Sequence, residues 1–219
     1  SPIISKNNKI EFYEKDFIFD GKTYFEYGNP VLEISKINLV GKHNYQNISY
    51  ALKVSRLLEI DTELIINALE NFKPVEHRIE YCGKYNNIEF YNDSKSTTFE
   101  STYAAIESFE KPVHLILSGV KKKGMNVKEF YFNIKKNKNV VKILIFGKIC
   151  EEYKEFVTEP DILYNSYDWE LFLKKYINEI ENNSIILFSP GMPSFDYFTN
   201  FEHRGKFFKQ VVAKLIKDS

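Results

Sequence analysis

The sequence predicts an α/β fold whose C-terminal part is Rossmann-like, with a mostly parallel sheet. After about residue 75, short runs of branched and aromatic residues alternate with segments whose apolar residues recur at helical spacing. Strands that alternate with amphipathic helices form βαβ units, which give parallel sheets with helices on both faces. The chain has 219 residues, enough for one large domain or for one domain and part of another.

The first 72 residues have a different pattern, in which short strands come before two helices. Asp20-Gly21 is typical of a hairpin turn, and Asp61 or Thr62 is the expected N-cap of the second helix. The residue before a proline disfavours helix, so Lys73-Pro74 places a domain boundary near Lys73, between 1–72 and 73–219. The strands are expected at 9–12, 16–19, 24–27, 31–34 and 37–40, and the helices at 44–58 and 61–69.

The second part reads as a hairpin followed by alternating helices and strands. Three of its loops leave the carboxyl ends of strands, at 92–98, 118–125 and 189–200. In open α/β sheets such loops share one edge, and ligands bind there. The expected hairpin is 80–84 with 88–91, the helices are 99–109, 127–136, 149–156, 168–180 and 201–217, and the strands are 113–118, 140–147, 162–164 and 184–189.

Composition excludes several classes of function. Lys plus Arg and Asp plus Glu both number 30, so the formal net charge is zero and gives no attraction to nucleic acid or to an anionic membrane. No apolar run approaches the roughly 20 residues of a membrane span. Two distant cysteines without ligand-spaced partners fit a reducing cytosol. We therefore expect a cytoplasmic protein.

The loop 92–98 carries the densest set of reactive groups. Asp93 offers a carboxylate, Lys95 a cation, and Ser94, Ser96 and Thr97 offer hydroxyls. The alternative is an ordinary strand-to-helix loop with Thr97 or Thr98 as N-cap, because loops are polar by default.

The other two loops also carry groups that suit an anion. Lys121 to Lys123 place three cations at a strand end, where a lysine can pair with a carboxylate or a phosphate. Ser194 and the backbone N–H groups that follow it could receive an anion near a helix start. Arg78, just past the domain boundary, could contact a phosphate. The alternatives are a solvated basic loop, a rigid capped connection and a surface ion-pair cluster, respectively.

Four segments in order resemble motifs of the Mur ligases of peptidoglycan synthesis. Residues 41–47 are similar to G-x-H-N-x-x-N, and 76–80 to P-H-R-x-E with Glu76 in place of the proline. Residues 92–97 are similar to N-D-S-K-A-T, and 189–205 to S-P-A-x-A-S-x-D followed by N-F-E-x-R-G. The set is most similar to the branch of the family that adds D-glutamate to UDP-N-acetylmuramoyl-L-alanine.

The resemblance implies an ADP-forming ligase in which ATP activates a carboxylate as an acyl phosphate and the amine of D-glutamate attacks it. Residues 1–72 would be the end of the family's central ATPase domain, and 73–219 its C-terminal domain. The phosphate loop and the main magnesium ligands lie upstream in the family, so the chain would be a fragment that is inactive alone. A monomer is expected.

The resemblance also implies roles for single residues. Asn44 and Asn47 would hold adenine, Arg78 the triphosphate, and Asp93 the ribose hydroxyls. Lys95 would stabilise charge that develops during the reaction. The residues expected to bind D-glutamate are Thr97 and Lys122 at one carboxylate, with Lys123 as the alternative to Lys122, and Ser194 and Phe201 at the other, with Phe195 also expected at the substrate. Two other functions stay open: another Mur or folylpolyglutamate-type amide ligase, or a non-catalytic nucleotide- or anion-binding α/β module.

Overall fold

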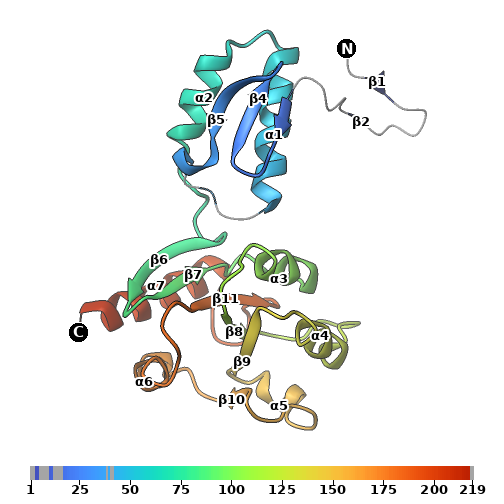
Figure 1. Cartoon of the computed structure of the whole chain (residues 1–219). Helices are drawn as coiled ribbons and strands as arrows, with labels where there is room; N and C mark the ends of the chain where they lie inside the picture. Colours follow the sequence, from blue (N-terminus) through green and yellow to red (C-terminus); the bar gives the residue numbers. More distant parts are fainter. Residues whose placement is uncertain (1–2, 5–9, 12–16, 38, 40–41, 218–219) are drawn as a thin grey trace. The chain divides into compact units, whose positions relative to one another are not determined.

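The computed structural model describes residues 3–4, 10–11, 17–37, 39 and 42–217 (Figure 1). The contacts divide the chain into two compact units, Ser1–Pro74 and Val75–Ser219. Within the described part of the chain, no helix combines the length and the hydropathy that crossing a membrane requires.

Unit 1 contains a three-stranded antiparallel sheet, a separate pair of antiparallel strands and two α-helices. Its core joins Tyr24 and Leu32 of the sheet to Ile48 and Leu52 of the first helix, and the hydroxyl of Tyr24 donates to the backbone oxygen of Tyr45 at 2.7 Å. The elements are β1 (Ile3–Ile4), β2 (Ile10–Glu11), β3 (Phe17–Phe19), β4 (Thr23–Glu26), β5 (Asn29–Glu33), the 3-10 helix Ile34–Lys36, α1 (Lys42–Leu57) and α2 (Thr62–Glu70).

The hairpin predicted at Asp20-Gly21 is confirmed, because β3 pairs antiparallel with β4 around that turn. Asp61 caps α2 by accepting from the backbone N–H of Glu63, as one of the two expected caps. The strand predicted at 37–40 is wrong for Ile37 and Leu39, which are in no strand and follow a 3-10 turn; Asn38 and Val40 lie outside the described residues. Of the strands predicted at 9–12 and 16–19, Lys9, Phe12 and Asp16 also lie outside them.

Unit 2 contains a six-stranded sheet in the order β10-β9-β8-β11-β7-β6. All neighbouring pairs are parallel except β6 with β7, so the predicted mostly parallel sheet is confirmed. The elements are β6 (Glu80–Tyr85), β7 (Ile88–Asn92), α3 (Phe99–Ile106), β8 (Val113–Ser118), α4 (Val127–Ile134), β9 (Val140–Phe146), α5 (Cys150–Tyr153), β10 (Ile162–Tyr164), α6 (Trp169–Tyr176), β11 (Ile185–Gly191) and α7 (Phe201–Lys217).

The strand order brings the three predicted loops together. β11 is inserted between β7 and β8, although it is the last strand in the sequence. The carboxyl ends of β7, β8 and β11 are therefore neighbours, and the loops 92–98, 118–125 and 189–200 leave from the same edge.

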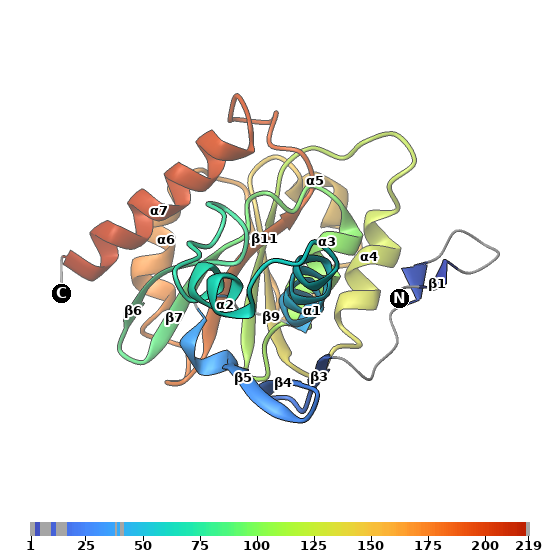
Figure 2. The same cartoon turned by 90° about the horizontal axis from the view of Figure 1, so that it is seen from above.

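Helices cover both faces of this sheet. Figures 1 and 2 show α3 and α4 on one side and α6 and α7 on the other. The core beneath α6 and α7 is strongly aromatic, with Phe90, Phe146, Trp169, Phe188 and Phe208 all fully buried. This dense packing makes the sheet edge a rigid base for the loops.

Several helices of unit 2 end two to four residues before the predicted positions. Past the end of α3, the N–H groups of Ser108 and Phe109 bond the carbonyls three residues back, of Ala105 and Ile106. Such 3-10 bonds tighten the last turn of a helix, so the apolar periodicity continues after the α-helix has ended. His114 of β8 is buried, and its Nδ1 lies 2.6 Å from the hydroxyl of Tyr176.

Candidate active site

The loop that follows β7 is folded inward around a buried carboxylate. Asp93 is 4% exposed, and its Oδ2 accepts hydrogen bonds from the hydroxyls of Ser96 and of Ser189, the latter at 2.8 Å. Its Oδ1 accepts from the backbone N–H of Ile79 at 3.2 Å. Burial raises the pKa of Asp93 to about 6, and the hydrogen bonds from Ser96, Ser189 and Ile79 offset part of that effect. A ribose contact by Asp93, which stays a prediction, would have to use its remaining lone pairs or replace one of these serines.

Arg78 projects from a strained turn that this carboxylate helps to hold. The two neighbours of Arg78 have left-handed backbones, with φ of 65° at His77 and 46° at Ile79. A β-branched residue at positive φ is an outlier, and such strain clusters at functional sites. Asp93 fixes the N–H of Ile79, and the N–H of Lys95 donates to the backbone oxygen of His77 at 3.1 Å. The exposed cations Arg78 and Lys95 are therefore presented from segments that are bonded to each other.

A cavity of about 580 Å³ between α3 and α4 contains two of the residues predicted to bind D-glutamate. Thr97 and Lys122 both line it, and so does Lys123. Stacked rings of Phe99 and Phe130, with centroids 3.8 Å apart, form part of its wall. The remaining lining residues are Thr98, Glu100, Tyr103, Gly124, Met125, Asn126, Glu129 and Asn133. The first and second loops thus line the same cavity, and both Lys122 and Lys123 are placed to bind a ligand in it.

The other predicted substrate residues lie on the third loop or follow it, and do not line that cavity. Ser194 is 2% exposed, whereas Phe195 is 72% exposed. The Nζ of Lys95 lies 5.8 Å from the ring centroid of Phe201, at the start of α7. Lys95 therefore lies near Phe201, and neither residue lines the cavity that contains Thr97 and Lys122. Phe195 faces solvent.

Asn44 and Asn47 lie one turn apart in α1 of unit 1. The Nδ2 of Asn47 donates to the Oδ1 of Asn44 at 3.3 Å, so the two amides face each other. Gly41 and the side chains of Lys42 and His43 lie outside the described residues. Adenine binding by the two asparagines stays a prediction.

The segment 76–80 also forms an ion-pair cluster. Ligand atoms of Glu76, His77 and Glu80 lie within 4.8 Å of one another, but the ammonium of Lys209 already bridges the two carboxylates at 3.0 and 2.5 Å. Burial lowers the pKa of His77, whose Nδ1 accepts from the Nδ2 of Asn92 at 2.8 Å. These contacts account for the cluster as a link between β6 and α7.

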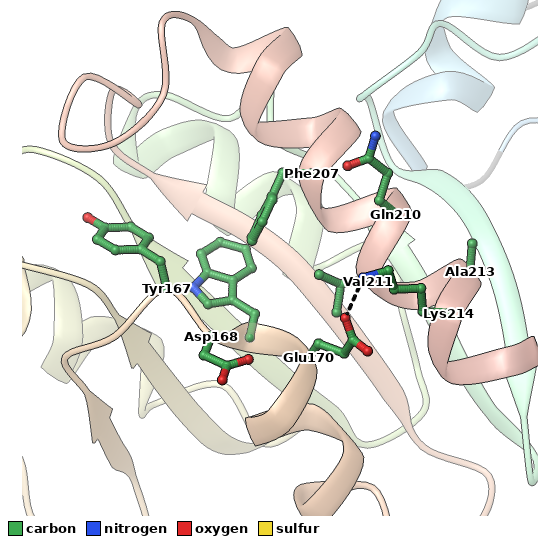
Figure 3. Close-up of a pocket in the computed structure, with 9 residues that line it drawn as sticks. Tyr167, Asp168, Glu170, Phe207, Gln210, Val211, Ala213 and Lys214 are labelled. Atoms are coloured by element: carbon green, nitrogen blue, oxygen red, sulfur yellow. Dashed lines mark hydrogen bonds and ion pairs between the residues drawn. The ribbon is translucent and has the colours of Figure 1, made fainter. Parts of the chain in front are cut away.

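A second cavity, of about 340 Å³, lies between α6 and α7 (Figure 3). Tyr167, Trp169 and Phe207 contribute aromatic surface to it, and Lys214 pairs with Glu170 at 2.8 Å across its rim. It contains none of the residues that the sequence analysis assigned to the site.

Two residues of the site were missed by sequence reasoning. Ser189 was treated only as a loop start, and Arg204 only as part of a motif. Arg204 is fully buried, and it falls on the same stripe of α7 as Phe208, Val211 and Leu215. A basic residue in register with an apolar stripe was the signal that could have identified it.

Comparison with known proteins decides which family these features belong with. A relative from Prochlorococcus marinus is 36% identical over 97% of this chain, and one from Bacillus cereus is 35% identical over 97%. Both are named UDP-N-acetylmuramoylalanine–D-glutamate ligase. The chain is a homologue of the Mur ligases. It spans about half of these relatives, 44% and 48% of their lengths, and no protein-family model matches the sequence.

Solved structures of Mur ligases share the fold of this chain. A MurF ligase from Thermotoga maritima in complex with ADP matches with a TM-score of 0.61 and 17% identity, over 94% of this chain and 47% of that one. A folylpolyglutamate synthase from Thermotoga maritima matches with a TM-score of 0.58 and 13% identity, over 96% of this chain and 50% of that one. At this identity the matches support the Mur ligase fold.

Proposed function

We propose that this chain is the second half of a cytoplasmic, monomeric ATP-dependent ligase that adds D-glutamate to UDP-N-acetylmuramoyl-L-alanine. The observation that carries the proposal is the 36% identity over 97% of the chain to a relative with that name. The convergence of the motif-bearing loops at one sheet edge adds support. Such a ligase serves peptidoglycan synthesis, and through the cell wall it serves cell shape and division. Units 1 and 2 would be the end of the central domain and the C-terminal domain.

The cavity between α3 and α4 is the proposed entry point for the amino acid. D-glutamate carries two carboxylates and one ammonium, so its site needs cations and at least one anion. The cavity provides Lys122 and Lys123 as cations and Glu100 and Glu129 as carboxylates. Thr97 adds a hydroxyl that can donate to a carboxylate. Ser194 and Phe201 are proposed for the second carboxylate.

ATP would supply the phosphoryl group that converts the substrate carboxylate into an acyl phosphate. The residues of this chain would then orient the amine and stabilise charge. Lys95 is proposed to stabilise the negative charge that grows on the attacked carbonyl, as a cation placed beside Phe201. Arg78 is proposed to contact phosphate, Asp93 ribose, and Asn44 and Asn47 adenine.

Magnesium is expected with ATP, and its main ligands would come from the other half of the protein. Among the described residues, one group of three potential ligands occurs, and Lys209 bridges its carboxylates. That group does not fit magnesium, which prefers oxygen ligands in near-octahedral geometry. No step of the reaction is assigned to a metal on this chain.

The direct test supplies the full-length protein with ATP, magnesium, UDP-N-acetylmuramoyl-L-alanine and one amino acid at a time. D-glutamate should give ADP, phosphate and the new amide, whereas L-glutamate, L-lysine and diaminopimelate should not. Consumption of another amino acid would instead support a different amide ligase. The 219-residue chain alone serves as the control and should release no phosphate. Tight nucleotide binding by that chain without turnover in either form would support a non-catalytic module.

A further inference from the structure

Arg204 contacts all three loops of the candidate active site. It lies one turn into α7 and is fully buried. Its Nε donates to the hydroxyl of Ser94 at 3.1 Å, and its Nη2 donates to the backbone oxygen of Ser94 at 2.9 Å. Its Nη1 donates to the backbone oxygens of Met192, at 2.9 Å, and Ser118, at 3.4 Å. One planar group thus joins segments that are far apart in the sequence.

The buried guanidinium of Arg204 is bonded to one hydroxyl and three backbone oxygens, and none of these four acceptors is a carboxylate. Burial lowers the pKa of Arg204 to about 9, and the charge of Asp196 offsets only part of that effect. The group is still cationic at neutral pH. A buried cation that bonds only carbonyls and a hydroxyl stabilises a fold poorly compared with an apolar side chain of similar size. What an arginine supplies at this position is therefore its hydrogen-bond geometry rather than stability.

The loops contact each other closely enough for one anchor to set the position of all three. The N–H of Val120 donates to the backbone oxygen of Pro193 at 2.8 Å. A Cβ on Gly119 would lie only 2.2 Å from that oxygen, so the second and third loops approach as closely as glycine permits. The hydroxyl of Ser94 donates to the backbone oxygen of Phe201 at 2.8 Å, which ties the first loop to the start of α7.

We propose that Arg204 is a positioning residue that fixes the relative placement of these three loops, and with them the groups that receive the amino acid. Its effect on catalysis rests on the proposed function, whereas its effect on the loops does not. Lysine could not replace it, because an ammonium is a single point charge and cannot direct donors toward three separate segments.

Hydrogen–deuterium exchange of the full-length protein tests the loop contacts without any assay of activity. In Arg204→Met, amides of 92–98, 118–125 and 189–200 should exchange at least about tenfold faster, while those of β9 change less than about twofold. Arg204→Lys should give the same pattern. Lys206→Met is the matched control, because Lys206 is an exposed cation on the same helix. Equal acceleration in β9 and the loops, or no acceleration in the loops, would overturn the proposal.

A milder variant keeps the test decisive if Arg204→Met does not fold. Ser94→Ala removes the hydroxyl that bonds both Arg204 and Phe201, and it should accelerate exchange in the first loop and the first turn of α7. In the ligase assay, Arg204→Lys should raise the KM for D-glutamate at least about tenfold and lower kcat. Loop acceleration with unchanged kinetics would contradict the catalytic role. A wild-type protein that does not use D-glutamate would contradict the proposed function and leave the exchange result standing.

Discussion

The hydroxyl of Ser189 donates to the carboxylate of Asp93 at 2.8 Å, across 96 positions of sequence. Asp93 follows β7 and Ser189 lies within β11, so the bond joins two adjacent strand ends. The same carboxylate holds the N–H of Ile79 and thereby the turn that presents Arg78. Asp93, which the motif predicts to contact a ligand, thus also holds two segments of the site together through hydrogen bonds.

The buried carboxylate should make stability depend on pH. The pKa of Asp93 is raised from 3.8 to about 6 in the folded protein, so the folded state binds the proton more tightly than the unfolded state. The contribution of this group is therefore most favourable below about pH 4 and is lost as the pH rises through about 6, by about 3 kcal/mol in total. Asp93→Asn lacks this titration, so its free energy of unfolding should increase relative to that of the wild type as the pH rises over that range.

Urea unfolding at several pH values, followed by fluorescence, measures this difference. Trp169 is the single tryptophan and is fully buried in unit 2, so its emission reports on the unit that contains Asp93. Burial lowers the pKa of His114 to about 4, which makes wild-type stability fall as the pH drops. That opposite effect cancels when variant and wild type are compared. A difference that stays constant between pH 4 and pH 7 would show that Asp93 does not titrate as described.

Close approach of two loops should make Gly119 sensitive to the smallest added side chain. Gly119 has φ of +120°, and an added Cβ would lie 2.2 Å from the backbone oxygen of Pro193. Gly124, with φ of +89°, has nothing within 4 Å of its Cβ position and provides the matched control. Gly119→Ala should lower the free energy of unfolding by about 3 kcal/mol or more, and Gly124→Ala by about 1 kcal/mol. Equal losses of unfolding free energy in the two variants would mean that positive φ alone explains both, and that the contact with Pro193 contributes nothing.

Proteases should cut the connection between the two units before they cut the interior of 88–215. Residues 71–76 are all exposed, and Phe72 is followed closely by Pro74. Proteases need an accessible, extended segment, which the packed strands of unit 2 do not offer. Chymotrypsin should cut after Phe72, and endoproteinase Glu-C after Glu70 or Glu76, before either cuts within 88–215. Mass spectrometry of the first fragments checks this order, and early fragments from inside 88–215 would contradict it.

Much of the fold could be predicted because its signals are local. The strands β8, β9 and β11 each contain at least three consecutive apolar residues, and Thr98 caps α3 through a box with Ser101, as one of the two expected N-caps. The short elements were less predictable. Ile34, predicted as the last residue of the strand 31–34, instead begins the 3-10 turn Ile34–Lys36. Periodicity alone does not separate these conformations over three or four residues.

The site was predictable as a group of loops, but the contacts within it were not. The position of β11 between β7 and β8 follows from tertiary packing, and it brings Ser189 to Asp93. The bonds of Arg204 likewise join segments 86 and 110 positions apart in the sequence. No short-range pattern in the sequence encodes such pairs. The loops of the site could therefore be predicted, but the hydrogen bonds between them could not.

The central claim is that the cavity formed by Thr97 and the lysine loop receives D-glutamate. The most direct test measures KM for D-glutamate and for ATP in the full-length protein with Lys122→Met and with Lys123→Met. Loss of a charged hydrogen bond costs about 1.5–3 kcal/mol, so one variant should raise the D-glutamate KM by about tenfold or more with little change for ATP. A large effect in Lys123→Met would keep the pocket and reassign its lysine. If neither variant alters the D-glutamate KM while both weaken ATP, the loop contacts phosphate and the claim is wrong.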